Sequence, residues 1–342
     1  MAELSERKKL ILAAVVEQYI KTGEPVGSKV LIACAGLNVS SATIRSEMSE
    51  LASMGYLEQP HTSAGRIPSS LGYRYYIDNL MKTREIDDIN RRLIEAGISS
   101  VAGDPERLLV QAGEILADMT NCAAVSTTPA GECSIIRRVE LVPVGTRTAM
   151  LVLLTSNGML KSRLCRLDCE LSPRIYEAFY NITSSTLAGR PVTEIGVATM
   201  QTAAASLGAD ALAMLPLLAA ASELAQSTAQ AQIKLEGQSN LLSHGDYGNG
   251  ALELMEFLNK NEPISRIFGN IHGGFDVKIG SENIYRQLEK SSVIAANYNV
   301  NGQNAGTIGL IGPTRMDYER IIPSVRYLTD LVGRLITQAL EE

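Results

Sequence analysis

Residues 39–68, VSSATIRSEMSELASMGYLEQPHTSAGRIP, constrain the fold of this chain more than any other segment. The first half predicts a helix that begins near Ser40 or Ser41, where a hydroxyl can cap the first turn. Gly55 ends this helix as a C′ glycine would. Its apolar residues recur at helical spacing and share one face: Ile44, Met48, Leu51 and Ala52. The opposite face is small and polar and carries Ala42, Ser46, Ser49 and Ser53.

A two-stranded hairpin is predicted directly after this helix. Residues 56–59 and 66–68 can pair as strands, with residues 61–65 as their loop. Two further helices are predicted before it, over residues 4–22 and 28–34. Three helices followed by a hairpin predict a winged helix-turn-helix, which binds DNA with its third helix in the major groove and its loop on the backbone.

The residue types in this segment favour contact with DNA. The whole chain carries a net charge of −6, which argues against a protein that coats nucleic acid non-specifically but allows a local basic patch. No acidic residue occurs between Gln59 and Ile77, whereas Arg66 and Arg74 do. Hydroxyls near a helix N-terminus can bind phosphate, and an arginine can read guanine. The candidate DNA-binding residues are Ser28, Lys29, Ser40, Ser41, Thr43, Arg45, Ser46, Ser49, His61 and Arg66, with Thr62 and Ser63 completing the loop.

Two clusters of strands, far apart in the sequence, follow this N-terminal unit. The first cluster is predicted at residues 122–127, 135–142, 148–155 and 159–167, with Asn157-Gly158 as a hairpin turn. The second is predicted at residues 277–280, 292–300 and 305–312, with Asn301-Gly302 as its turn. We expect one α+β domain that is split by a helical insert.

Helices are predicted around these strands. One covers residues 69–81, residues 82–103 form a linker or connecting helix, and the last helix starts near Thr314, with Pro323 expected to kink or delay it. Between residues 196 and 231 only Asp210 and Glu223 are charged, so this stretch must be buried in its own chain or in a second copy. The predicted domains are residues 1–82 (winged helix), 83–103 (connection), 104–190 and 273–342 (split domain) and 191–272 (insert).

Several other patterns do not carry a function. The five cysteines are scattered without a CxxC pair, which is typical of a protein of the reducing cytoplasm. The N-terminus has no apolar core of a signal peptide, and the longest apolar run, residues 211–221, is too short to cross a membrane. We expect no metal, no cofactor and no enzymatic activity. Gly302, Gly306, Gly309 and Gly312 are not followed by the Lys-Ser/Thr of a phosphate-binding loop. Cys165 and Cys169 have no histidine nearby that would complete a metal site, and His244 and Asp246 have no third catalytic partner.

Four segments resemble the HrcA family of heat-inducible transcription repressors. They are EPVGSKVL at 24–31, residues 39–78, GQSNLL at 237–242 and GTIGLIGPTRMDYERII at 306–322. The resemblance therefore covers nearly the whole chain. The family pattern has an asparagine where this chain has Ser46, and often a proline where it has Ala42, so base preference can differ.

The resemblance implies a fold and a regulatory scheme. The N-terminal domain would bind double-stranded DNA at an inverted-repeat operator upstream of chaperone operons, and a GAF-like domain would be interrupted by an inserted dimerisation domain. The GroE chaperonin would keep the homodimer active, and heat stress would divert the chaperonin to unfolded proteins. An alternative stays open, in which a small molecule bound by the GAF-like domain controls DNA binding.

Overall fold

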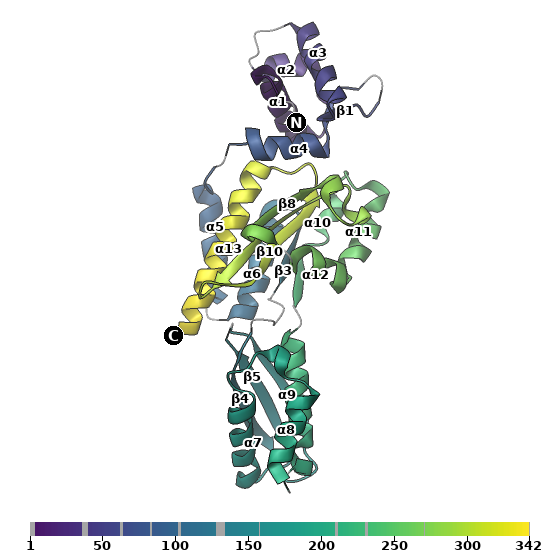
Figure 1. Ribbon diagram of the computed structural model, residues 1–342. Coiled ribbons are helices and arrows are strands. Elements are labelled where there is room, and N and C mark those ends of the chain that lie inside the picture. Colours follow the sequence, from purple (N-terminus) through teal and green to yellow (C-terminus); the bar gives the residue numbers. More distant parts are fainter. Residues whose placement is uncertain are drawn as a thin grey trace.

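The protein is described from a computed structural model, which defines residues 4–35, 40–61, 64–82, 84–101, 104–127, 134–156, 158–208, 211–229, 232–269 and 271–341. The chain is mixed α+β and elongated, with three units stacked along its length (Figure 1). A helical unit lies at one end, a five-stranded sheet with helices in the middle, and a three-stranded sheet with helices at the other end.

The N-terminal unit contains the predicted three helices and hairpin. Its helices are α1 (Glu6–Thr22), α2 (Ser28–Ala35) and α3 (Ser41–Ser53). Strands β1 (Leu57–Glu58) and β2 (Ile67–Pro68) pair antiparallel. A single β-bridge between Val26 and Arg66 extends this hairpin toward the start of α2.

Local sequence explains where these helices begin and end. The hydroxyl of Ser5 accepts a hydrogen bond from the backbone of Lys8 at 3.4 Å, and that of Ser40 accepts one from Thr43 at 3.2 Å. Each serine satisfies a backbone N–H that the first turn leaves free. Gly23 ends α1 in the left-handed region, with φ of 71°.

The segment after the hairpin is more divided than predicted. The expected helix over residues 69–81 is α4 (Ser70–Tyr75) followed by a π-helical turn, η1 (Tyr76–Leu80). The connection contains a true helix, α5 (Asp88–Ile98), which continues into a 3₁₀ turn (Ser99–Val101). Helix α6 (Pro105–Thr120) lies outside the elements predicted above.

The middle unit is a five-stranded antiparallel sheet with strand order β7-β3-β10-β9-β8. Its strands are β3 (Ala123–Thr127), β7 (Ile233–Glu236), β8 (Phe275–Ile279), β9 (Ser291–Val300) and β10 (Gln303–Pro313). The predicted turn between β9 and β10 is confirmed, because Asn301 and Gly302 both have positive φ, 52° and 76°.

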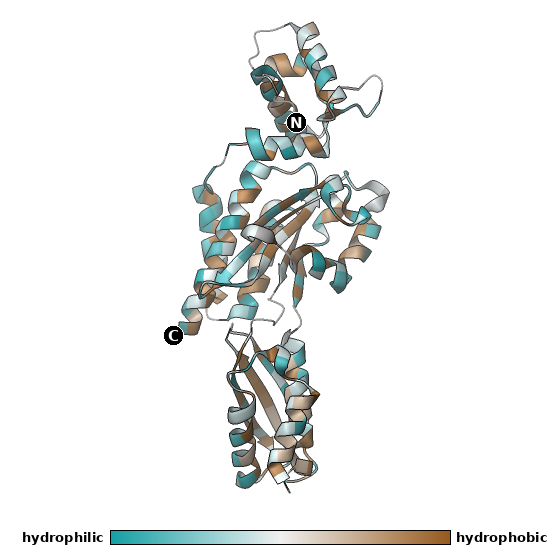
Figure 2. Cartoon of the chain, in the orientation of Figure 1, coloured by the Kyte–Doolittle hydropathy of each residue, from teal (hydrophilic) through white to brown (hydrophobic). Residues whose placement is uncertain are grey.

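Helices cover both faces of this sheet. One apolar core joins α6 and α13 (Tyr318–Glu341) to one face. A second core joins α10 (Asn240–Ser243), α11 (Ala251–Leu258) and α12 (Asn261–Gly269) to the other. Figure 2 shows that hydrophobic residues are concentrated along the strands of the sheet. Short 3₁₀ turns occur at Val192–Glu194, Gly248–Gly250, His272–Gly274, Gly280–Glu282 and Arg286–Leu288.

Helix α13 contains Pro323, at which a kink or a delay of the helix was expected. It begins at Tyr318, four residues later than predicted, and the Asp317 carboxylate accepts a hydrogen bond from the backbone of Arg320 at 3.3 Å. The predicted apolar stripe is buried at Ile321, Val325, Leu328 and Val332. Pro323 is the sixth residue of the helix and lacks the N–H that would donate to the carbonyl of Glu319.

The third unit corrects the expected grouping of the strands. Strands β4 (Ile136–Gly145), β5 (Thr148–Thr155) and β6 (Leu160–Arg166) form a separate sheet, order β4-β5-β6, rather than a sheet with β9 and β10. Helices α7 (Pro173–Thr186), α8 (Val197–Leu207) and α9 (Ala211–Ala229) complete this unit, with a core of their own.

The expected insert of residues 191–272 therefore does not match the sheets. The chain leaves the five-stranded sheet after β3 and returns to it with β7, while residues 240–269 cover its face. Strand periodicity predicts that a segment is a strand but not which sheet it joins, because pairing depends on residues far away in sequence.

One face of the three-stranded sheet carries exposed apolar side chains beside charged ones such as Arg138 and Arg166. The register aligns Val142, Met150 and Leu164 in one row, and Leu154 and Leu160 in another. Leu160 is 57% exposed and Leu164 is 63% exposed, whereas the alternate residues of β5 are buried against the helices. Within the described residues, no helix is long and apolar enough to span a bilayer.

Candidate nucleic-acid interface

Helix α3 presents its small polar face to solvent. Arg45, Ser46 and Ser49 are exposed, as is Ala42. The opposite face is buried through Ile44, Met48 and Leu51. An exposed helix face without bulky side chains can approach the edges of base pairs closely, and B-DNA admits one helix in its major groove.

The hydroxyls at the start of α3 are organised by hydrogen bonds. Ser40 Oγ and Thr43 Oγ1 lie 2.9 Å apart, and Ser28 Oγ lies 2.9 Å from Ser41 Oγ. The second contact joins the first residue of α2 to the first residue of α3. Both helix N-termini are therefore held side by side, with their free backbone N–H groups close together.

Ion pairs hold α3 against α1 on its buried side. Arg7 Nε donates to Glu47 Oε1 at 2.7 Å, and Lys8 Nζ lies 3.4 Å from Glu47 Oε2 and 2.8 Å from Glu50 Oε2. Burial by itself would raise the pKa of Glu47, but the hydrogen bond and charge of Arg7, with the charge of Lys8, outweigh it and lower that pKa. Glu47 therefore stays ionised and fixes the helix.

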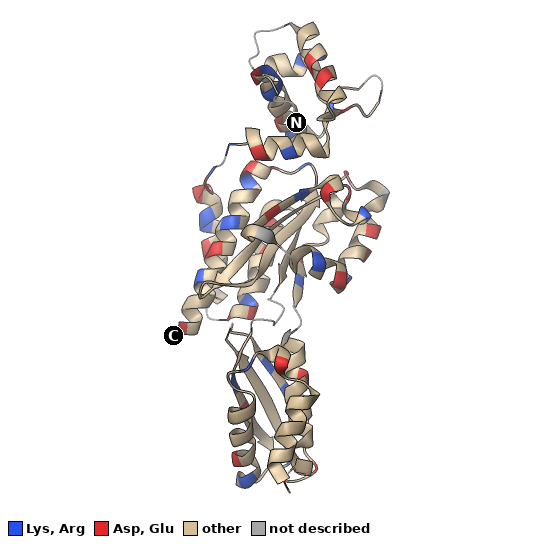
Figure 3. Ribbon diagram, viewed as in Figure 1, with Lys and Arg blue, Asp and Glu red and all other residues tan. Residues whose placement is uncertain are grey.

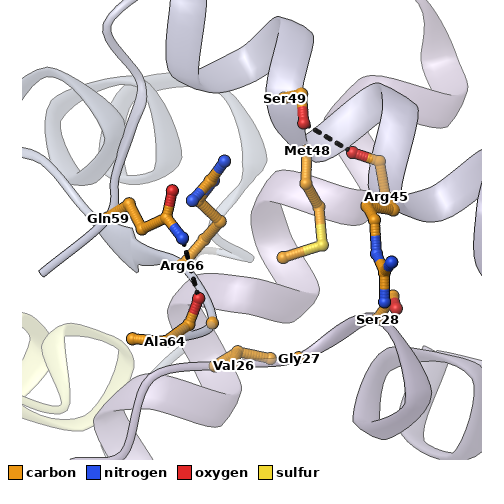
Figure 4. Close-up of a pocket in the computed structure, with 10 residues that line it drawn as sticks. Val26, Gly27, Ser28, Arg45, Met48, Ser49, Gln59, Ala64 and Arg66 are labelled. Atoms are coloured by element: carbon orange, nitrogen blue, oxygen red, sulfur yellow. Dashed lines mark hydrogen bonds between the residues drawn. The ribbon is translucent and has the colours of Figure 1, made fainter. Parts of the chain in front are cut away.

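A groove of about 440 Å³ separates α3 from the hairpin (Figure 4). Arg45, Met48 and Ser49 line it from α3, while Val26, Gly27 and Ser28 line it from the start of α2. The hairpin contributes Gln59, Ala64, Gly65 and Arg66. In Figure 4 the Arg45 side chain extends toward Ser28, so a cation and a hydroxyl face the same space.

The hairpin side of the groove is closely packed. Gln59 Nε2 donates to the carbonyl of Ala64 at 3.2 Å across the loop. A Cβ atom added at Gly65 would lie 2.5 Å from the backbone carbon and oxygen of Val26, so only glycine fits there. Arg66 Nε is buried and has no hydrogen-bond partner among the described residues, so its hydrogen-bonding capacity is unused in the free protein.

The charges around the groove are locally favourable to an anion. Lys29 and Arg45 are exposed, and within the described part of the chain neither they nor Arg66 forms an ion pair. Figure 3 shows that the N-terminal unit carries both basic and acidic residues. Arg74 was expected to be available to phosphate, and the structure contradicts this expectation. It lies in α4 and pairs with Glu282 and Asp78 instead of facing the groove.

Four of the ten predicted site residues line this groove, and the others lie at the starts of α2 and α3, on α3 and in the loop. Ser28, Arg45, Ser49 and Arg66 line it, Ser40, Ser41 and Thr43 lie at the start of α3, and Lys29 and Ser46 are exposed nearby in the sequence. His61 is exposed at the start of the loop, and Thr62 and Ser63 lie outside the described residues. Sequence reasoning missed Gln59 and Gly65, although Gly65 in a hairpin is itself a signal of close backbone approach.

The discounted patterns have structural roles in this fold. Gly306 and Gly309 lie within β10, and a Cβ atom there would meet Thr127 O at 2.1 Å and Ile294 O at 2.2 Å. His244 Nε2 contacts Asn121 O at 2.7 Å, and Asp246 pairs with Arg315. Cys165 is buried in the three-stranded unit, and no group of three or more metal-ligand side chains is found among the described residues.

Comparison with known proteins gives consistent matches along the chain. A model of the HrcA protein C-terminal domain matches residues 106–322. The heat-inducible transcription repressor HrcA of Acetivibrio thermocellus is 33% identical over 330 residues, which cover 95% of this chain and 94% of the relative. The protein of the same name from Carboxydothermus hydrogenoformans is 35% identical over 339 residues, 97% and 98% of the two chains.

One solved structure also matches over nearly the whole length. It is a crystal structure described as that of a hypothetical protein, with a TM-score of 0.71 and 26% sequence identity. The alignment covers 98% of this chain and 100% of the other. The arrangement of the three units is therefore similar in a second protein.

Proposed function

This chain belongs to the HrcA family of heat-inducible transcription repressors, and we propose that it represses chaperone operons as a homodimer bound to an inverted-repeat operator. The observation that carries the proposal is the groove between α3 and the hairpin, with the exposed polar face of α3 beside it. A helix and a hairpin on either side of a groove can hold one strand of a duplex between them.

We propose that residues 1–82 work as a winged helix-turn-helix. Helix α3 enters the major groove, with Arg45, Ser46 and Ser49 toward the base edges. Arg66 and His61 lie on the hairpin, where they would contact the phosphate backbone. The N-termini of α2 and α3 would bind further phosphates through Ser28, Lys29, Ser40, Ser41 and Thr43.

The buried donor on Arg66 supports this assignment. A buried polar group without a partner costs free energy unless something else satisfies it. A phosphate oxygen in the groove would accept from Arg66 Nε, and the exposed Lys29 would add a second charge. Binding would then remove a penalty that exists in the free protein.

We propose that the middle unit, residues 104–127 and 232–342, is the GAF-like domain, and that residues 134–229 are the inserted dimerisation domain. The uncovered face of the β4-β5-β6 sheet supports the second assignment. Val142, Leu160 and Leu164 form part of an exposed apolar surface that a second copy would cover. A two-fold dimer brings identical surfaces together, as an inverted repeat requires.

Dependence on the GroE chaperonin is part of the proposal and rests on the family alone. The repressor would act in the cytoplasm, where chaperonin and operator are both present. Client proteins that unfold on heating would compete for the chaperonin, and repression would then fail. The three-unit architecture, with an exposed apolar sheet face in each monomer, is compatible with a need for assisted folding.

The test is transcription from a chaperone-operon promoter, reconstituted with this protein, with and without added GroE chaperonin. We expect repression to depend on the operator and to increase with chaperonin. Equal repression with and without chaperonin would remove the regulatory scheme and leave DNA binding intact. Equal binding to operator and scrambled duplexes in a gel shift would refute the specific-repressor proposal itself.

A further inference from the structure

The covalent connection between the N-terminal unit and the rest of the chain does not define their relative orientation. After the π-helical turn η1 ends at Leu80, residues 81, 82 and 84–87 form no helix or strand. An irregular segment of this length does not by its own backbone geometry define one orientation of the units it joins. This segment is packed, because Ile86 is buried in the apolar core and Arg84 lies 3.4 Å from Glu319. Any fixed orientation of α3 must therefore come from non-covalent contacts.

Arg315 makes the first of these contacts. It lies between β10 and α13, and it donates from Nε and Nη2 to the Asp246 carboxylate at 3.3 and 3.2 Å. Its Nη1 also donates to the carbonyl of Ile20 at 3.3 Å. Ile20 belongs to the last turn of α1, whose carbonyls have no partner within the helix, so Arg315 caps α1 from another unit.

Gly23 makes the approach of Arg315 possible. A Cβ atom at this position would lie 3.2 Å from Cζ of Arg315, which is tighter than ordinary contact. The left-handed backbone that ends α1 at Gly23 therefore also leaves room for the guanidinium. The end of α1 and the β10–α13 loop fit each other closely.

Arg74 makes the second contact, on α4. Its Nε donates to Glu282 Oε1 at 2.9 Å, and Nη2 reaches Glu282 and the backbone carbonyl of Val277. Asp78 accepts from Nη1 at 3.3 Å. Glu282 is itself fixed, because its carboxylate accepts from the backbone of Ile279 at 2.9 Å.

Aromatic packing lies at the same interface. The rings of Tyr73 and Tyr318 are 5.8 Å apart, and both side chains are buried. Tyr76 donates from its hydroxyl to Glu319 at 3.0 Å. The apolar cores of the N-terminal unit and the five-stranded sheet are therefore continuous. Beside this core, Arg315 contacts the end of α1, and Arg74 on α4 contacts the sheet domain.

We propose that Arg315 and Arg74 are positioning residues that lock the DNA-binding unit onto the sheet domain and so determine which half-site spacing the dimer accepts. This inference rests on the proposed function, because spacing has a meaning only for a dimer on an inverted repeat. If each DNA-binding unit is held rigidly on its sheet domain, the dimer presents its two α3 helices at one separation and one rotation. If the DNA-binding unit is not held, each α3 can bind its half-site independently of the other.

The experiment uses the full-length protein and an inverted repeat that the protein itself selects from random-sequence duplexes. Affinity is measured by fluorescence anisotropy for this repeat and for versions with the half-sites moved apart by one to about ten base pairs, roughly one turn. The variants are Arg74→Gln/Arg315→Gln and, as a second route, Asp246→Asn/Glu282→Gln. The control is Arg266→Gln, which removes an exposed ion pair within α12.

We expect the wild type and Arg266→Gln to lose at least about tenfold in affinity when about five base pairs, half a turn, are inserted. Both double variants should lose less than about threefold on the same insertion, while their affinity for an isolated half-site stays unchanged. A destabilised fold would lower half-site affinity as well, so that readout separates positioning from unfolding. Coincident spacing profiles for wild type and variants would overturn the inference.

The proposed function fails in a different way. If selection recovers no inverted repeat, or if the wild type binds scrambled duplexes equally well, repression at an inverted repeat is refuted before spacing is tested. If the wild type prefers its repeat and binds equally well at every half-site spacing, only the inference that Arg315 and Arg74 determine the spacing is refuted.

Discussion

The Nε atom of Arg7 on α1 donates a 2.7 Å hydrogen bond to Oε1 of Glu47 on α3, across 40 residues of sequence. Glu47 is buried, whereas the residues before it on the outer face of α3, Arg45 and Ser46, are exposed. The same helix is thus held by charge on its inner side and left free on its outer side. That division is what a helix needs if it is to be rigid and still accessible to DNA.

Glu47→Gln should destabilise the N-terminal unit by about 1–2 kcal/mol, because a neutral amide replaces a carboxylate that is paired with Arg7 and Lys8. The pKa of Glu47 is lowered from 4.5, so its stabilisation is present above that pH and is lost as pH falls through the native pKa. Hydrogen exchange of the α3 amides at several pH values checks this. A difference between wild type and variant that does not shrink in acid would contradict it.

Arg45→Ala should weaken operator binding by about 1–3 kcal/mol if Arg45 reads a base, because a bidentate contact to guanine would be lost. The affinity for scrambled duplex should change less. Gel shifts with both duplexes measure the two losses. Arg266→Ala is the matched control, since Arg266 is an exposed arginine on α12 that lies outside the groove. Equal losses on both duplexes would make Arg45 a phosphate contact instead.

Gly65→Ala should disturb the hairpin, because the new methyl group would lie 2.5 Å from the backbone of Val26. We expect a cost of about 1–3 kcal/mol from overpacking and a loss of affinity for operator and scrambled duplex alike. Circular dichroism and gel shifts measure the two effects. Gly269→Ala is the control, because a methyl group there meets nothing within 4 Å. Unchanged DNA affinity would exclude the hairpin from the interface.

Leu164→Glu should yield monomers, because it places a charge in the apolar sheet face proposed for dimerisation. Leu212→Glu on α9 alters a side chain that is 80% exposed outside that sheet face and should leave the dimer intact. Light scattering gives the mass of each. If Leu212→Glu is the variant that dissociates, then the α8–α9 surface is the interface and the sheet face is not.

Cys122 should resist alkylation in the folded protein. Burial raises the pKa of its thiol to about 11, and the sulfur packs 3.7 Å from the sulfur of Met316. At pH 8 almost no thiolate is present, and the thiolate is the reactive form. Mass spectrometry after iodoacetamide treatment should find Cys169, which is partly exposed, modified before Cys122. Rapid modification of Cys122 without denaturant would indicate that the core beside β3 opens.

The sequence predicted the local elements of the N-terminal unit better than it predicted which strands share a sheet. The face of α3, its serine cap and the hairpin are local features, so spacing of a few residues is enough to identify them. The assignment of β4–β6 to a separate sheet was missed, since alternating apolar residues do not specify a pairing partner. Helix α6 was also missed, although Asp104 caps it and Pro105 follows in its first turn.

Arg74 illustrates the same division at a single residue. In the sequence it lies in an acid-free stretch and looks available to phosphate, but its partner Glu282 is 208 residues away. The sequence alone determined the local elements and the outer face of α3, because periodicity, caps and turns act over a few residues. Only the tertiary structure decided which cations remain free, which strands share a sheet and how the DNA-binding unit is held, because these depend on contacts between distant residues.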